Sequence, residues 1–342
     1  MDEAASTAGG SPMMIGASPS HRFDEFIRGF LDETLHAPLM SFMQRPRKGV
    51  REKLVRLGAV LTHADVDSEQ VQKVCDLVEA VHCGSLIVDD IQDDSPVRRE
   101  HPSLHRQVGV SKALNAGNWL YFWALQEIRS LNLKEDIKRG LLDDFLDMFF
   151  EGHCGQALDL GRRIETVPAQ HVPSLCLQAV KLKTGSLTSL ALASGARLGQ
   201  PADLELLKIF GVRLGVLLQQ LDDLKNLKLG DATVAEPDQK AFEDLRNGRP
   251  TYLWWFATEH LDSSCHRELA SAVEDFPQLE KLRQWQEKYD FHAQALEAIQ
   301  CDFTRFEQDF ERYATDHKLD TKVLPELGTI FHQLESAYEQ TR

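Results

Sequence analysis

Acidic side chains within two almost wholly apolar stretches constrain this sequence more than any other feature. The first stretch, VHCGSLIVDDIQDD over residues 81–94, ends in four aspartates, and the second, IFGVRLGVLLQQLDDLKNLKL over 209–229, carries an aspartate pair. A helix that is apolar on every side is typically buried. A carboxylate on such a helix must be protonated, paired with a cationic group or bound to a metal ion. Both stretches therefore need positive charge close by.

Helical spacing gathers the polar residues of each stretch on one face. In the first stretch they are His82, Ser85, Asp89 and Asp93, and in the second Gln219, Asp222, Asp223 and Asn226. Asp90 lies about 100° round the helix from Asp89. Two carboxylates about 5 Å apart repel by roughly 3 kcal/mol at an effective dielectric constant of 20. Mg²⁺, shared with the phosphate groups of a substrate, would relieve that repulsion.

Basic residues accompany these acidic clusters. Arg98 and Arg99 follow the first cluster, and Lys48 and Arg51 are one helical turn apart in RPRKGVREKL. Lys183 interrupts the apolar segment LQAVKLKTGSLTSLALA, where a lysine usually has a partner. Each of these residues alone is more often a surface charge than a ligand. Together they suit a substrate that carries phosphate.

The remaining pattern is helical. Phe23, Phe26, Ile27, Phe30 and Leu31 have the spacing of one helix face, and no convincing alternation of period two marks a strand. We therefore expect an all-α fold, with residues 1–20 as a mobile tail and residues 21–342 as a single domain. Residues 232–239, with Pro237, have the composition of a loop.

Charge and composition exclude several classes of protein. The 342 residues contain 38 Lys and Arg against 53 Asp and Glu, a formal net charge of −15. That balance argues against binding to nucleic acid or to an anionic membrane surface. No stretch approaches the ~20 apolar residues of a membrane-spanning helix. Six scattered cysteines without a CxxC pair favour reduced thiols and a cytoplasmic protein.

From about Lys48 to Leu253 the sequence resembles the trans-isoprenyl diphosphate synthases of the polyprenyl synthetase family. VDDIQDDSPVRRE is similar to the DDxxD motif with its two following arginines, and LQQLDDLKNL to FQxxDDxxD with Asn226 at the last acidic position. GQALDL, KTGSL and EDLRNGRPTYL stand in the family's order, the last with Arg249 where lysine is usual. RPRKGVREKL and HCGSLIVDDIQDDS look most like the eukaryotic-type geranylgeranyl diphosphate synthases.

The resemblance implies an isoprenoid synthase-type helical bundle around a central cavity, a homodimer and a Mg²⁺-dependent site for two diphosphates. The implied metal ligands are Asp89, Asp90, Asp93, Asp222 and Asp223. The implied ligands of the allylic diphosphate are Arg98, Lys183, Thr184, Gln219, Lys240 and Arg249, among which Lys183, Thr184 and Gln219 would also be catalytic. The implied pocket for isopentenyl diphosphate is formed by Lys48, Arg51, His82 and Arg99. Glu100, where the family usually has glycine, adds a negative charge near this site.

Product length depends on residues deeper along the first stretch. Gly84 and Ser85 are small, whereas family enzymes that stop at fifteen carbons often have aromatic rings there. Tyr121, Phe122 and His153 resemble the residues that close the pocket of twenty-carbon enzymes, although aromatic residues at helical spacing are more often core. The hypothesis is therefore geranylgeranyl diphosphate as product, with farnesyl diphosphate as the alternative.

Two alternatives from other classes have less support. A class I terpene cyclase shares the fold and a DDxxD motif but has no use for a second diphosphate pocket. A non-catalytic partner subunit of a prenyl synthase commonly lacks acidic ligands, and both aspartate pairs are intact here.

Overall fold

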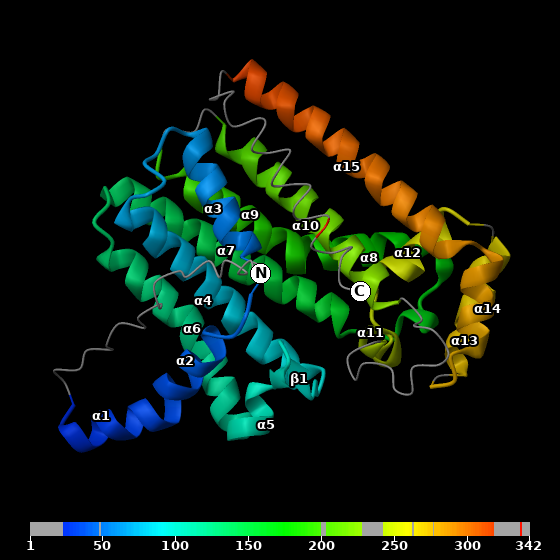
Figure 1. Ribbon diagram of the computed structural model, residues 1–342, viewed down its shortest axis with the longest axis horizontal. Coiled ribbons are helices and arrows are strands. Elements are labelled where there is room, and N and C mark those ends of the chain that lie inside the picture. The colour runs from blue at the N-terminus through cyan, green and yellow to red at the C-terminus, as the bar shows by residue number, and fades with distance from the viewer. Residues whose placement is uncertain are drawn as a thin grey trace, which may run out of the picture. The chain divides into compact units, whose positions relative to one another are not determined.

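The computed structural model describes residues 23–47, 49–199, 203–227, 242–261, 263–275, 277–317 and 336, and the fold is all-α, as predicted (Figure 1). The chain forms two compact units. Of the described residues, the first unit contains those up to Arg47 together with Ala80–Ala124, and the second contains the others. Two long helices contribute residues to both units, namely α4 (Glu69–Gln92) and α6 (Val110–Ser130). A single domain over residues 21–342 stays a prediction.

The first unit is built from short elements together with parts of α4 and α6. Its short elements are α1 (Glu25–Leu31), the π-helical segment η2 (Asp32–His36), α2 (Ala37–Met43), β1 (Val97–Arg98), β2 (His101–Pro102) and α5 (Leu104–Val108). β1 and β2 pair antiparallel, with Arg98 opposite His101. This hairpin was not predicted, because strands of two residues are too short to show an alternating pattern.

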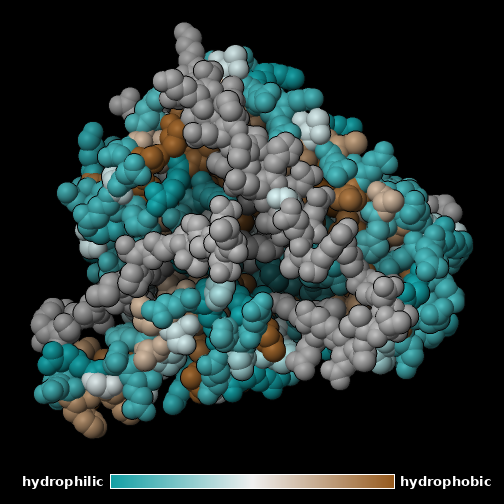
Figure 2. All heavy atoms as spheres, in the orientation of Figure 1, coloured by the Kyte–Doolittle hydropathy of each residue, from teal (hydrophilic) through white to brown (hydrophobic). Residues whose placement is uncertain are grey.

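The predicted apolar stripe after residue 22 forms α1, but its apolar side chains are not buried. Phe26 is 78% exposed and Phe30 is 57% exposed, and α1 has no buried residue. Figure 2 shows brown, apolar side chains over α1 at the lower left, on a face whose coloured surface is otherwise mostly hydrophilic. The periodicity thus predicted the helix correctly. Within the described part of the chain, however, no element covers the apolar face of α1.

The second unit contains the longer helices. They are α3 (Val50–Leu61), α7 (Glu135–Asp159), η3 (Ile164–Thr166), η4 (Ala169–His171), α8 (Val172–Val180), the π-helical η5 (Lys181–Gly185), α9 (Ser186–Ala196), α10 (Leu204–Asn226), α11 (Glu243–Asn247), α12 (Tyr252–Glu259), α13 (Ser263–Glu274), α14 (Glu280–Lys288) and α15 (Phe291–Asp316). Among the residues described, no helix combines the length and apolar character needed to cross a membrane.

Helix α9 is the centre of the second unit, because every one of its residues is buried. Figure 1 shows α3 and α10 beside it. Glycines permit the close approach on both sides. A Cβ at Gly195 would overlap the backbone of Val55 in α3, and a Cβ at Gly211 in α10 would lie 2.5 Å from Cα of Ser189. This packing fixes α10, which carries the second aspartate pair. Ile209, at 54% exposed, shows that α10 is not buried on every side, contrary to the sequence pattern.

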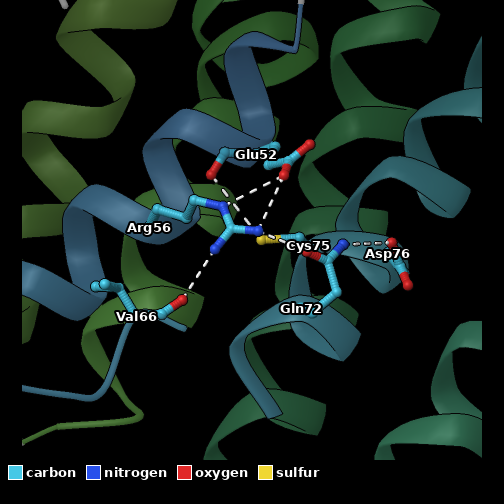
Figure 3. A network of polar contacts seen from close by, with 6 residues as sticks. All are labelled: Glu52, Arg56, Val66, Gln72, Cys75 and Asp76. Carbon is cyan, nitrogen blue, oxygen red and sulfur yellow. Dashed lines mark hydrogen bonds and ion pairs between the residues drawn. The ribbon is translucent and has the colours of Figure 1, made fainter. Parts of the chain in front are cut away.

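A polar network ties α3 to the beginning of α4 within the second unit (Figure 3). Arg56 donates from Nη1 to the carbonyl oxygen of Val66 at 2.9 Å, and from Nη2 to Oε1 of Gln72 at 2.5 Å. Its Nε lies 3.2 Å from Oε1 of Glu52, one turn earlier in α3. The network therefore holds the connection between the two helices with one guanidinium group.

Candidate active site

The first aspartate cluster ends α4, and its nearest cation comes from the hairpin. Nε of Arg98 donates to Oδ1 of Asp90 at 2.7 Å, and Nη2 of Arg98 lies 3.5 Å from Oδ2 of Asp89. Asp90 is fully buried, so its charge requires this compensation. Asp93 is half-buried on the turn that follows. The predicted metal ligands Asp89 and Asp90 are thus brought together with the predicted diphosphate ligand Arg98.

The turn of the hairpin contains the two residues after Arg98. Arg99 has φ of 54° and Glu100 has φ of 63°, and a two-residue turn with positive φ at both positions normally contains Asn and Gly. Glu100 is exposed. Glycine at position 100, in place of Glu100, would therefore relieve the backbone strain and also remove a negative charge.

Of the residues predicted to set product length, Gly84 and Tyr121 are in contact with each other, whereas Phe122 is exposed. A Cβ at Gly84 would lie 2.8 Å from the carbonyl oxygen of Gly117 and 3.0 Å from Cε1 of Tyr121. Gly84 therefore allows α4 and α6 to meet, with the Tyr121 ring packed across it. Burial raises the pKa of the Tyr121 hydroxyl, and the negative charge of Asp89 acts in the same direction. Phe122, in contrast, is 71% exposed on another side of α6.

Four further predicted residues lie on α4, α7 and α3. Oγ of Ser85 donates to the carbonyl oxygen of His82 at 2.8 Å, and His82 is buried. His153 is exposed on α7, where its Nδ1 lies 2.7 Å from the carbonyl oxygen of Phe149. Arg51 is half-buried at the start of α3. Lys48 and Lys240, as well as the loop predicted over 232–239, lie outside the described residues.

In the second unit, Lys183 and Arg249 converge on one residue that the sequence analysis did not select. Nζ of Lys183 lies 2.9 Å from Oδ2 of Asp159, and Nη1 of Arg249 donates to the carbonyl oxygen of Asp159 at 3.1 Å. Asp159 ends α7 within the motif GQALDL, so the motif itself was the signal that could have identified it. The two cations are thereby held together although 66 residues separate them in sequence.

A chain of hydrogen bonds links Thr184 to the second aspartate pair. The Thr184 hydroxyl donates to Oε1 of Gln219 at 2.9 Å, and Nε2 of Gln219 donates to Oδ1 of Asp223 at 2.8 Å. The amide N–H of Tyr252 donates to the other oxygen, Oδ2 of Asp223, at 2.8 Å. Both oxygens of Asp223 are therefore engaged within the protein, whereas Asp222 is half-buried beside it.

Asp223 is in an environment that disfavours its charge. Burial raises its pKa to about 8, and the negative charge of Asp244 acts in the same direction, against the hydrogen bonds from Gln219 and Tyr252. Asp223, Asn226, Glu243 and Asp244 line one small cavity. A positive charge at this cavity would stabilise the ionised form of Asp223, since burial and Asp244 both disfavour it.

The carboxylate oxygens of the two aspartate clusters could bind Mg²⁺ if a substrate supplied further oxygen ligands. Mg²⁺ usually binds through one or two carboxylates, with water and substrate phosphate completing an octahedron. Asp89 and Asp93 on one helix, and Asp222 on another, could each supply such oxygens. In the described part of the chain, no three acidic, histidine or cysteine side chains form a group that could hold a metal ion without added ligands.

The end of α10 is held by hydrogen bonds from α14 and α15. Nε2 of Gln286 in α14 donates to the carbonyl oxygen of Leu227 at 3.2 Å, and Nε2 of His292 in α15 lies 3.3 Å from the same oxygen. Leu227 comes directly after Asn226, the last polar residue of the second aspartate motif. Residues beyond 261, for which the sequence predicted no role, therefore stabilise the helix end next to the motif.

Several known proteins are similar to this chain in sequence. A family model described as polyprenyl synthetase matches residues 32–289. A geranylgeranyl pyrophosphate synthase 2 from Zymoseptoria tritici is 30% identical over 222 residues, which cover 64% of this chain and 62% of that protein. A sesterterpene synthase from Colletotrichum orbiculare is 32% identical over 233 residues, which cover 65% of this chain and 30% of that protein. The matches thus span less than two thirds of the length of these curated relatives.

Solved structures show the same fold. A crystal structure of a geranylgeranyl pyrophosphate synthase has a TM-score of 0.74 at 22% identity, covering 89% of this chain and 92% of that chain. The synthase from Corynebacterium glutamicum, complexed with isoprenyl diphosphate and magnesium, has a TM-score of 0.72 at 21% identity and covers 91% of each chain. Because the family model spans well over half of the sequence, this chain belongs to the polyprenyl synthetase family.

Proposed function

We propose that this protein catalyses the Mg²⁺-dependent head-to-tail condensation of isopentenyl diphosphate with an allylic diphosphate, with geranylgeranyl diphosphate as the main product. The observation that carries the proposal is the presence of two aspartate clusters, each on a helix that packing and hydrogen bonds fix in place. The first adjoins Arg98, and the second is linked through Gln219 to the Lys183–Thr184 segment. Membership of the family and the similarity to fungal geranylgeranyl pyrophosphate synthases support it.

The reaction begins with loss of pyrophosphate from the allylic substrate. The carbon–oxygen bond breaks, negative charge develops on the leaving oxygen, and an allylic carbocation remains. Mg²⁺ bound with the substrate would neutralise part of that charge. Arg98 and Lys183 would each contribute positive charge to the diphosphate leaving group, where it stabilises the transition state more than the ground state. In this step each cation would exchange its carboxylate partner for phosphate.

The carbocation then needs a dry environment with few nucleophiles. Because the Thr184 hydroxyl donates its proton to Gln219, its oxygen lone pairs remain available to stabilise positive charge. Gln219 uses both ends of its amide on Thr184 and Asp223, so its role is to orient them. The double bond of isopentenyl diphosphate forms the new carbon–carbon bond, and released pyrophosphate accepts the proton that is lost. No basic side chain of the protein is required.

The remaining assignments follow the family. Lys48, Arg51, His82 and Arg99 would bind isopentenyl diphosphate, and Lys240 and Arg249 would assist on the allylic diphosphate. We further propose a cytoplasmic homodimer. The exposed apolar residues of α6, Leu114 at 40% and Phe122 at 71%, suit a contact between two copies of the chain.

One observation favours farnesyl diphosphate as a second candidate product. The Tyr121 ring lies against Gly84, five residues before Asp89, and the pKa of its hydroxyl responds to Asp89. An aromatic ring at this depth would close a pocket early. If Tyr121 is the floor, Tyr121→Ala lengthens the product, whereas Phe122→Ala does not, because Phe122 points to the surface.

Product analysis tests the proposal. Purified protein with Mg²⁺ and isopentenyl diphosphate is incubated separately with dimethylallyl, geranyl or farnesyl diphosphate, and the dephosphorylated alcohols are sized. Twenty-carbon alcohol is the expected result, and fifteen-carbon alcohol would keep the reaction but change the product. Asp89→Asn serves as the inactive control. Absence of elongation with every primer in a folded protein would contradict the proposal and favour a cyclase or a non-catalytic subunit.

A further inference from the structure

Arg45 is a buried cation in the first unit that the proposed reaction does not use. It follows α2 and is only 6% exposed. Its Nη1 donates to the carbonyl oxygen of Arg98 at 3.1 Å, and its Nη2 donates to the carbonyl oxygen of Pro102 at 3.1 Å. The guanidinium also lies over the ring of Phe42, 4.6 Å from the centroid. Arg45 is thus hydrogen-bonded to the main chain of both β1 and β2.

The hairpin that Arg45 holds is strained at its turn. Arg99 and Glu100 both have positive φ, which costs roughly 1–2 kcal/mol for each residue that has a Cβ. Such a conformation persists only where the surroundings enforce it. An open hollow of about 420 Å³, lined in part by Arg45, His101 and Pro102, adjoins β2, so close packing does not cover the hairpin on that side.

The position of the hairpin matters because Arg98 extends from it. The side chain of Arg98 reaches Asp90 and Asp89, while the main chain of the same residue is bound by Arg45. Burial lowers the pKa of Arg45, and the negative charge of Asp90 opposes this shift. Arg45 remains charged, since even a lowered arginine pKa stays far above neutrality.

We infer that Arg45 is a positioning residue for the diphosphate-binding arginine Arg98, acting through the main chain of the hairpin. The inference rests on the proposed function, in which Arg98 binds the allylic diphosphate. Charge alone does not suffice for this role. A guanidinium presents two parallel donors to two carbonyl groups, whereas a lysine ammonium is a flexible point charge. Arg45→Lys should therefore behave like Arg45→Met, although it keeps the positive charge.

A double-mutant cycle on binding of inorganic pyrophosphate with Mg²⁺ tests the inference, measured by calorimetry on the full chain. Arg45→Met and Arg45→Lys should each weaken binding roughly tenfold, the size of effect that loss of a buried hydrogen bond to a charged group gives. Arg98→Ala should weaken it at least as much. In the Arg98→Ala background, Arg45→Met should have no further effect, because residues that act through one another are not additive.

Gln107 supplies a matched control. Its Nε2 donates to the same Pro102 carbonyl oxygen at 2.6 Å, and no contact with Arg98 accompanies this hydrogen bond among the contacts described. Gln107→Met should leave pyrophosphate affinity unchanged. Melting temperatures are measured for all variants, and Arg45→Lys carries the test if Arg45→Met does not fold.

The possible failures are distinguishable. If Arg98→Ala weakens binding but the Arg45 variants do not, or if the two effects add, the inference is overturned while the proposed function stands. If Arg98→Ala leaves the affinity unchanged, the proposed role of Arg98 fails and the inference fails with it.

Discussion

Asp222 and Asp223 are adjacent in sequence, yet their side chains are in different environments. Asp223 is buried with hydrogen bonds to both oxygens, and Asp222 is half-buried. Asp223→Asn would place an amide NH₂ against a donor, either Gln219 or the Tyr252 N–H. We expect it to lower the free energy of unfolding by about 1–3 kcal/mol. Asp222→Asn should change that free energy by less than about 0.5 kcal/mol while abolishing elongation.

Urea unfolding followed by circular dichroism, together with product analysis, separates the two effects. Equal losses of stability in the two variants would contradict the different environments of the carboxylates.

A second prediction at the scale of single residues concerns Glu100. Its φ of 63° is strained for any residue with a Cβ. Glu100→Gly should therefore raise the free energy of unfolding by about 1 kcal/mol, less the entropy that glycine adds to the unfolded chain. Glu100→Ala removes the same charge but keeps the Cβ, and should give no such gain. If Glu100→Ala stabilises as much as Glu100→Gly in thermal unfolding, charge repulsion and not backbone strain is the cause.

At the scale of helices, the position of α10 depends on elements far from it in sequence. Gln286 donates to the Leu227 carbonyl oxygen just after the second aspartate motif. Gln286→Ala should increase amide hydrogen exchange in the last turn of α10 and lower the unfolding free energy by about 1 kcal/mol. Gln284 is the matched control, because it is exposed on α14, the helix of Gln286, and is hydrogen-bonded only to Glu280 among the contacts described. Gln284→Ala should leave exchange in α10 unchanged, and equal effects of both variants would contradict the capping role.

At the scale of the whole molecule, the fold extends beyond the region that the family model matches. That match ends at residue 289, whereas α15 begins at Phe291 and packs Phe310 against Phe210 of α10, with ring centroids 4.8 Å apart. Phe310→Ala should destabilise the protein by about 3–5 kcal/mol, because it opens a cavity beside a buried aromatic cluster. Phe26→Ala, at a ring that is 78% exposed, should have little effect on denaturant unfolding. A loss in Phe310→Ala no larger than the loss in Phe26→Ala would contradict the support that α15 gives to α10.

The sequence by itself determined the all-α class and the family, and it predicted the aspartate clusters and the other candidate ligands as a site. These depend on helical periodicity and on short motifs, which are local properties of a chain. It also predicted the helix at α1, but not that its apolar face is exposed, because burial depends on what packs against a helix.

Only the tertiary structure decided which of these residues meet. It brought Lys183 and Arg249 to Asp159, placed Tyr121 across Gly84 while leaving Phe122 exposed, and engaged both oxygens of Asp223. The contact of Arg45 with the hairpin could not be predicted from the sequence. Its two acceptors are main-chain carbonyl oxygens, which every residue has, so no residue type marks them. Most of these contacts join residues that are tens of positions apart in the sequence. The packing of whole helices therefore sets the distances between the side chains of the site.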